Sequence, residues 1–307
     1  MHVLVTGGAG FIGSHSTEAL LADGANVTVL DNFSAGKRSN LPETHANLRI
    51  VKGDIRDAAA VAAAVSGITH VLHLAAQVSV QSSVSDPVNS SQHNITGFLN
   101  VMDAARRAGA TRAAYASSAA VYGSPQTLPL DESSPVGPIS PYGLEKWIND
   151  QYARLFRDLY NFSSLGMRYF NVYGPRQDPS SSYAGVISKF ASAITSGTPL
   201  RIFGDGGQTR DFVYVKDIAR MNVHALKSSH NGICNIGTGR SVTLLGLVDA
   251  LERCAGRKAE RRFEPPAAGD IRESSMAPQR QRQWFNDQPA TTLDEGLAAL
   301  LATLPGH

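Results

Sequence analysis

Short runs of β-branched and apolar residues alternate with longer helix-like segments along the first half of the chain. The runs are "HVLVTG" (2–7), "NVTVLD" (26–31), "LRIVKGD" (48–54), "HVLHLAA" (70–76), "TRAAYASS" (111–118) and "SSLGMRYF" (163–170). The last run follows a helical pattern from about Pro141 to Tyr160. Strands separated by helices form right-handed βαβ units on a parallel sheet. The alternation predicts an α/β fold with a Rossmann-type doubly wound parallel sheet of six or seven strands.

The alternation stops after Tyr169. Two loops rich in Pro, Ser and Gly, "VYGPRQDPSSSYAG" and "FGDGGQTRD", flank a predicted helix over about 181–196. Beyond them, "FVYVKDIARMNVHAL" and "GICNIGTG" are typical of a strand and helix that return to the main sheet. We therefore expect a first domain of residues 1–170 and 212–240. Residues 171–211 and 241–307 would form a smaller, discontinuous C-terminal domain that binds substrate.

Composition excludes several classes of function. The net charge of +2 in 307 residues indicates no basic surface for nucleic acid. Cys234 and Cys254 form no C-x-x-C motif, so we expect neither a metal site nor a disulfide framework. No apolar run reaches the roughly 18 residues of a membrane span. Because the first strand-like run begins at His2, we expect no signal peptide. We expect a cytoplasmic protein without nucleic-acid or membrane partners.

A glycine-rich loop joins the first strand to the first helix. In "VTGGAGFIGSH", Gly8, Gly10 and Gly13 satisfy G-x-G-x-x-G. Glycine lets backbone N–H groups approach a pyrophosphate, and the helix N-terminus favours an anion. Asp31 ends the second strand, where a carboxylate accepts the ribose hydroxyls and repels a 2′-phosphate. The pattern predicts NAD binding; a turn that merely requires glycine is the alternative.

Ser118, Tyr142 and Lys146 form a second pattern. Tyr142 and Lys146 are four residues apart in a predicted helix and so share a face. A lysine ammonium favours the tyrosine phenolate, and lowering its pKa from ~10 to ~7 requires roughly 4 kcal/mol. Ser118, at the end of the fifth strand, would donate to and position the same substrate hydroxyl. The pattern predicts a proton-transfer site; a buried tyrosine with a neighbouring lysine is the alternative.

Eight segments together resemble the extended short-chain dehydrogenase/reductases of the NAD-dependent epimerase/dehydratase family, and most closely its UDP-sugar 4-epimerases. They are "TGGAGFIGSH", "DNFSAGKRSNL", "GDIRD", "HLAAQVSV", "SSAAVYG", "SPYGLEKW", "RYFNVYGPRQDP" and "GDGGQTRDFVYV". Dehydratases of this family have Asp and Glu after the Ser/Thr, whereas this chain has Ala119 and Ala120. Methyl groups transfer no proton. The resemblance thus implies 4-epimerisation of a UDP-hexose, with a 4-keto intermediate and tightly bound NAD.

The resemblance also assigns residues to the site. For the cofactor it implies Gly7, Gly10, Phe11, Ile12, Gly13, Asp31, Asn32, Ser34, Gly36, Asp54, Ile55, Leu74, Ala75, Ala76, Gln77, Asn94, Ser117, Tyr142, Lys146 and Phe170. For the substrate it implies Ser118, Tyr142, Asn171, Arg210, Asp270, Arg272 and Ser274. Ser118, Tyr142 and Lys146 would be the catalytic residues.

The C-terminal segment departs from the family pattern. Ala267 stands where R-x-G-D places an arginine on the diphosphate, and Arg272, Arg261 or Arg262 would have to replace it. Ser274 matches a gate near carbon 2 of the sugar. A serine there leaves room for an N-acetyl group, so UDP-GlcNAc and UDP-GalNAc are expected substrates beside UDP-glucose and UDP-galactose.

Two helices carry broad apolar faces, one with Ile95, Phe98, Leu99 and Met102, the other with Trp147, Ile148, Tyr152, Leu155 and Leu159. One face of a sheet buries only part of such stripes, so we expect a homodimer built on a four-helix bundle, as in family dimers. Three alternatives stay open: a UDP-uronate 4-epimerase, a net nucleotide-sugar oxidoreductase and a non-catalytic NAD-binding protein.

Overall fold

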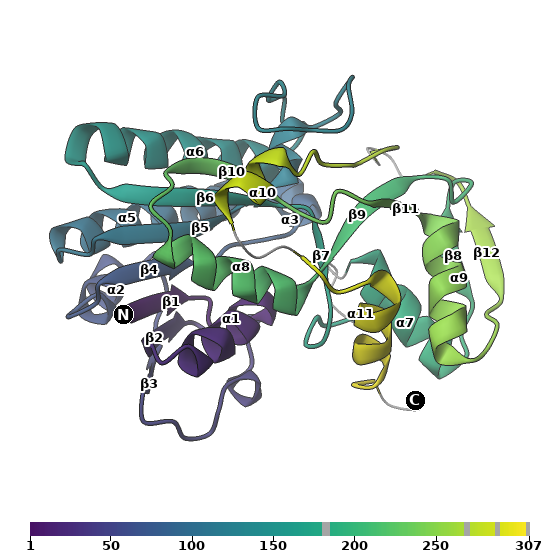
Figure 1. Cartoon of the computed structure of the whole chain (residues 1–307), viewed down its shortest axis with the longest axis horizontal. Coiled ribbons are helices and arrows are strands. Elements are labelled where there is room, and N and C mark those ends of the chain that lie inside the picture. The colour runs from purple at the N-terminus through teal and green to yellow at the C-terminus, as the bar shows by residue number, and fades with distance from the viewer. Residues whose placement is uncertain (180–184, 267–270, 286–288, 305–307) are drawn as a thin grey trace.

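A seven-stranded parallel sheet forms the main body of the chain, which is described here by a computed structural model over residues 1–179, 185–266, 271–285 and 289–304. The strand order is β10-β6-β5-β4-β1-β2-β3 (Figure 1). The strands are β1 His2–Thr6, β2 Asn26–Asp31, β3 Leu48–Lys52, β4 His70–His73, β5 Arg112–Ser118, β6 Ser163–Tyr169 and β10 Gly232–Ile236. The predicted doubly wound sheet is confirmed, with seven strands.

Helices cover both faces of this sheet and define two apolar cores. Helix α1 (Phe11–Ala22) packs beside α8 (Val215–Lys227), where Leu20, Ile218 and Met221 are buried. On the other face lie α2 (Ala58–Ala64), α5 (Gly97–Arg107) and α6 (Pro141–Tyr160), which bury Phe98 and Phe156. Apolar strands buried on both sides are typical of parallel sheets.

Short helices connect these elements. They are η1 (Arg38–Asn40), α3 (Val80–Ser85), α4 (Pro87–Ser91), η2 (Gln92–Thr96), η3 (Ala119–Tyr122) and α10 (Gln279–Trp284). Of these, η2 is a single π-helical turn inserted between α4 and α5. Such π-turns are frequent at functional sites.

A second, smaller core lies beyond the C-terminal end of β6. It contains a three-stranded sheet of β7 (Asn171–Tyr173), β9 (Thr209–Tyr214) and β11 (Ser241–Thr243), and a pair of β8 (Leu200–Phe203) with β12 (Arg261–Glu264). Helices α7 (Val186–Ser196), α9 (Leu244–Ala255) and α11 (Leu293–Leu301) pack around these strands (Figure 1).

The expectation that the strand within 212–226 belongs to the main sheet is wrong. That strand is β9, which pairs with β7 in parallel and with β11 in antiparallel orientation. Phe212 and Tyr214 are buried in the small core, and this burial fixes the pairing. The following segments do return to the main body, because α8 packs on α1 and β10 pairs with β6.

No helix in the described part of the chain is long and apolar enough to cross a membrane.

Candidate active site

One large cavity of about 1300 Å³ opens at the carboxyl ends of the main-sheet strands and extends to the small core. Ligands of doubly wound folds bind at this edge, and single-ligand pockets measure roughly 300–1,000 Å³. The volume therefore suits a dinucleotide together with a second ligand. Most of the predicted site residues line this cavity: Gly7, Gly10, Phe11, Ile12, Gly13, Asp31, Asn32, Ser34, Gly36, Ile55, Leu74, Ala75, Ala76, Ser117, Ser118, Tyr142, Lys146, Phe170, Asn171 and Arg210.

At Gly7 and Gly13 the glycine loop is packed too tightly to accept a side chain. A Cβ atom on Gly13 would collide with the carbonyl oxygen of Gly7, and Gly7 itself has a φ of +69°. The Asp31 carboxylate accepts the N–H groups of Ala9 and Phe33, each at 2.8 Å, which ties the loop to the end of β2. Bare backbone at the start of α1, with a carboxylate beside it, fits the pyrophosphate and ribose of the predicted NAD.

Two elements bring the predicted catalytic residues together. Ser118 ends β5, whereas Tyr142 and Lys146 lie in the first turns of α6. Helix α6 begins here because Ser140 caps it, accepting the Gly143 N–H at 3.1 Å, and Pro141 occupies its first position. Lys146 Nζ donates to the carbonyl oxygen of Ala116 at 2.9 Å and lies 5.7 Å from the centre of the Tyr142 ring.

The predicted fall in the Tyr142 pKa is not found in this structure, in which the pKa is raised. Burial raises the pKa of Tyr142; a hydrogen bond with Ser118 opposes the shift, and the Glu145 carboxylate adds to it. Burial lowers the pKa of Lys146 to about 8, although Asp150 and Glu145 partly counter this effect. The charge of Lys146 can be read from the sequence, but the depth at which both groups are buried cannot.

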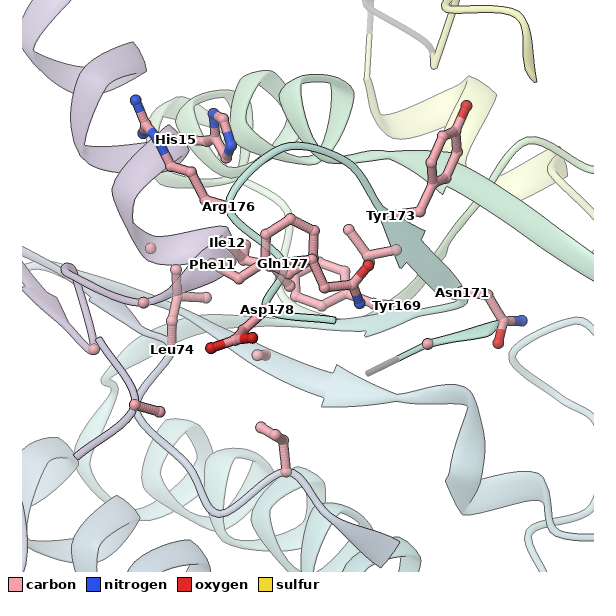
Figure 2. A pocket seen from close by; sticks show the side chains of 18 of the residues that line it. Phe11, Ile12, His15, Leu74, Tyr169, Asn171, Tyr173, Arg176, Gln177 and Asp178 are labelled. Carbon is pink, nitrogen blue, oxygen red and sulfur yellow. The ribbon is translucent and has the colours of Figure 1, made fainter. Parts of the chain in front are cut away.

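Segment 174–178, which we call the strap, lies across the start of α1, and its residues 175–178 line the same cavity (Figure 2). The Nε2 atom of His15 lies 3.0 Å from the Pro175 carbonyl oxygen. The Arg176 guanidinium donates to Ser14 Oγ at 3.2 Å and pairs with Glu18 at 2.5 Å. Sequence reasoning did not find these residues, because "GPRQDP" alone does not reveal which helix it contacts.

Three predicted cofactor residues do not line the cavity. Asp54 is paired with Arg56 at 2.8 Å and accepts a bond from Asn32 at 2.9 Å, and these bonds hold the pKa of Asp54 well below its usual range. Asn94 is buried behind the wall and bonds both backbone groups of Gln77. Asp54, Gln77 and Asn94 thus support the residues that face the cavity.

The predicted substitutes for the missing arginine are engaged elsewhere. Arg272 pairs with Asp205 at 2.6 Å and lines a smaller neighbouring pocket. Arg261 pairs with Asp249 and Glu252, and Arg262 with Glu260. Arg201 on β8, which the sequence did not indicate, lines the large cavity together with Arg210 and is itself paired with Glu264.

Ser274, another predicted substrate residue, lies beside Thr209. Ser274 donates its backbone N–H to the Thr209 carbonyl oxygen at 3.1 Å and does not line the large cavity. The gate role of Ser274 stays a prediction. Asp270 and Ala267 lie outside the described residues. Over residues 1–179, 185–266, 271–285 and 289–304, no cluster of three His, Cys, Asp or Glu side chains could hold a metal ion.

Known proteins with the same architecture include sugar-nucleotide epimerases. UDP-glucose 4-epimerase of Mycolicibacterium smegmatis is 40% identical over 303 residues, which cover 97% of this chain and 96% of that protein. The solved UDP-N-acetylglucosamine 4-epimerase of Methanobrevibacter ruminantium M1, in complex with UDP-N-acetylmuramic acid, has a TM-score of 0.95 at 38% identity and covers 98% of this chain and 97% of its own.

UDP-glucose 4-epimerase of Thermus thermophilus, in complex with NAD, has a TM-score of 0.90 at 39% identity, with 99% of this chain and 98% of that chain covered. The family profile described as "NAD dependent epimerase/dehydratase family" matches residues 3–237. The family profile matches most of the chain, and the relatives align with it over nearly their whole length. Together these matches establish the family. The chain belongs to the NAD dependent epimerase/dehydratase family.

Proposed function

We propose that this protein is an isomerase that interconverts UDP-hexoses at carbon 4, with NAD as a tightly held cofactor. The observation that carries the proposal is the convergence of Ser118, Tyr142 and Lys146 on a cavity that also contains the glycine loop. Relatives named UDP-glucose 4-epimerase and UDP-N-acetylglucosamine 4-epimerase support the reaction. Ala119 and Ala120, directly after Ser118, offer no acid and base for dehydration.

The chain's own residues bind the sugar and move the proton. Tyr142, as phenolate, accepts the proton of the 4-hydroxyl, and Ser118 donates a hydrogen bond to the same oxygen. The Lys146 ammonium beside the Tyr142 ring, together with the positive charge of bound NAD, would offset the effect of burial on the Tyr142 pKa and favour the phenolate. Bound NAD would supply a reversible hydride acceptor for carbon 4. The 4-keto sugar turns over between the two transfers, and Tyr142 then returns the proton.

Arg210 on β9 and Asn171 on β7, which both line the cavity, are the proposed nucleotide contacts. A guanidinium binds phosphate oxygens in a bidentate manner. We propose that both the glucose/galactose pair and the N-acetyl pair are substrates, because Ser274 is small. Residues 171–211 and 241–307 would supply the substrate side, together with the remainder of β9, which ends at Tyr214.

The proposed quaternary structure is a homodimer through α5 and α6. Leu144, Leu155, Leu159 and Tyr160 of α6 are exposed although they are large and apolar. A bundle of two α5 and two α6 helices would cover them. The large apolar side chains of α5, such as Phe98 and Met102, are instead buried in the core of the main body.

Tyr142→Phe tests the proposed chemistry directly. The variant keeps the ring but cannot take a proton, so turnover of UDP-galactose should fall roughly 1,000-fold or more, while NAD content after gel filtration stays at the wild-type level. A coupled assay for UDP-glucose measures the first quantity, and absorbance of acid-released NAD measures the second. Turnover near the wild-type rate would refute the role of Tyr142.

A further inference from the structure

A buried carboxylate lies between the two catalytic residues of α6. Glu145 is only 3% exposed, and the proposed chemistry gives it no role. Burial of a carboxylate is costly unless hydrogen bonds compensate it, so the contacts of Glu145 indicate what it does.

Oε2 of Glu145 accepts two side-chain hydrogen bonds from the helical segment before α5. Ser90 Oγ donates at 2.9 Å and Asn94 Nδ2 at 2.6 Å. Both donor residues are buried. Asn94 belongs to the π-helical turn η2, which interrupts the regular helix spacing between Ser90 and α5.

Asn94 links Glu145 to the wall of the cavity. Its Oδ1 accepts the Gln77 N–H at 2.8 Å, and its Nδ2 donates to the Gln77 carbonyl oxygen, also at 2.8 Å. Gln77 directly follows Leu74, Ala75 and Ala76, which line the cavity beside the glycine loop. A Cβ atom on Gly7 would lie 2.8 Å from the Ala75 nitrogen, so this wall and the loop are in close contact.

We propose that Glu145 is a positioning residue that, through Asn94, holds the segment 74–77 in the place that retains the cofactor. The proposal rests on NAD as the cofactor of the proposed function. The Glu145 oxygen orients the Asn94 amide, and the oriented amide bonds both backbone groups of Gln77. Without the acceptor, Asn94 can rotate away, and the wall loses its support beside the glycine loop.

Two substitutions of similar volume separate hydrogen bonding from packing. Glu145→Gln keeps an acceptor oxygen for Ser90 and Asn94, whereas Glu145→Met fills the same space without one. We expect NAD to dissociate from Glu145→Met about ten-fold faster than from the wild type, the effect of one or two buried hydrogen bonds. Glu145→Gln should release NAD at close to the wild-type rate.

The measurement is NAD remaining on the full-length protein after rapid gel filtration at increasing delays, with no sugar present. Glu132 offers a matched control, because its buried carboxylate accepts the Asn235 N–H at 2.7 Å outside the cavity. Glu132→Met should therefore retain NAD as the wild type does. Wild-type retention by Glu145→Met, or equally fast release from Glu145→Gln and Glu145→Met, would overturn the proposal.

Asn94→Leu gives an independent test should Glu145→Met fail to fold. It should release NAD as fast as expected for Glu145→Met, and slow release would overturn the proposal. Where both variants fold, combining them should add little, because both break one connection. Failure of the proposed function is a different result: the wild type and Glu132→Met would then both fail to turn over UDP-sugars, while NAD release is still measured.

Discussion

At the level of single residues, the charge that the proposed chemistry requires on Lys146 is opposed by the burial of that side chain. Its ammonium is required to favour the Tyr142 phenolate, yet burial lowers the pKa of Lys146 from 10.5 to about 8. A base with a lowered pKa loses its charge as the pH rises through the new value. The activity of the wild type should therefore decline above about pH 8.

Lys146→Arg tests this assignment, because a guanidinium stays charged up to a pH of about 12. We expect the variant to be several-fold slower at pH 7, since Arg cannot reproduce the Lys146–Ala116 bond in the same geometry. Its activity should, however, no longer decline between pH 8 and pH 10. The pH profile of kcat measures this. A decline identical to that of the wild type would assign the titration to another group.

At the level of secondary-structure elements, the feature to test is whether the contacts of the strap with α1 help to retain NAD. It connects β7 to the start of α1 through Arg176–Glu18 and His15–Pro175, and Figure 2 shows Arg176 and His15 beside that helix. Because Arg176 also lines the cavity, Arg176→Ala should speed NAD release. The ion pair is partly exposed, so the expected change is only about two- to five-fold.

Lys227→Ala is the matched control for the strap. Lys227 also pairs with an acidic residue of the α1 region, Asp23, at 2.5 Å, but neither residue lines the cavity. The control should retain NAD as the wild type does. Equal release from both variants would show that any loosening of α1 suffices and that the strap has no specific role.

The proposed dimer is a property of the whole molecule. Leu159→Glu places a charge on the exposed apolar face of α6, which is costly only if that face is covered by a partner. We expect the wild type to have the mass of a dimer in light scattering, and Leu159→Glu to shift toward the monomer without loss of helix content in circular dichroism. A monomeric wild type at micromolar concentration would contradict the four-helix bundle.

The sequence predicted the main sheet and most of the cavity because both depend on local patterns. The alternation of strand and helix patterns predicts that the strands run parallel. The carboxyl ends of parallel strands meet at one edge of the sheet, which brings Ser118 close to Tyr142. The pairing of β9 was not predictable, because the same apolar strand fits either sheet. The contacts of Arg176 and Glu145 depend on segments far apart in sequence, and the Tyr142 pKa depends on burial.

The most direct test of the central claim, epimerisation with retained NAD, is proton NMR of the purified protein with UDP-galactose and no added cofactor. A parallel sample would contain UDP-N-acetylgalactosamine. We predict that the anomeric signal of the gluco epimer grows in both samples until equilibrium is reached. No NADH should accumulate in either sample. No new signal in either sample, even after NAD is added, would contradict the assignment of this protein as a UDP-hexose 4-epimerase.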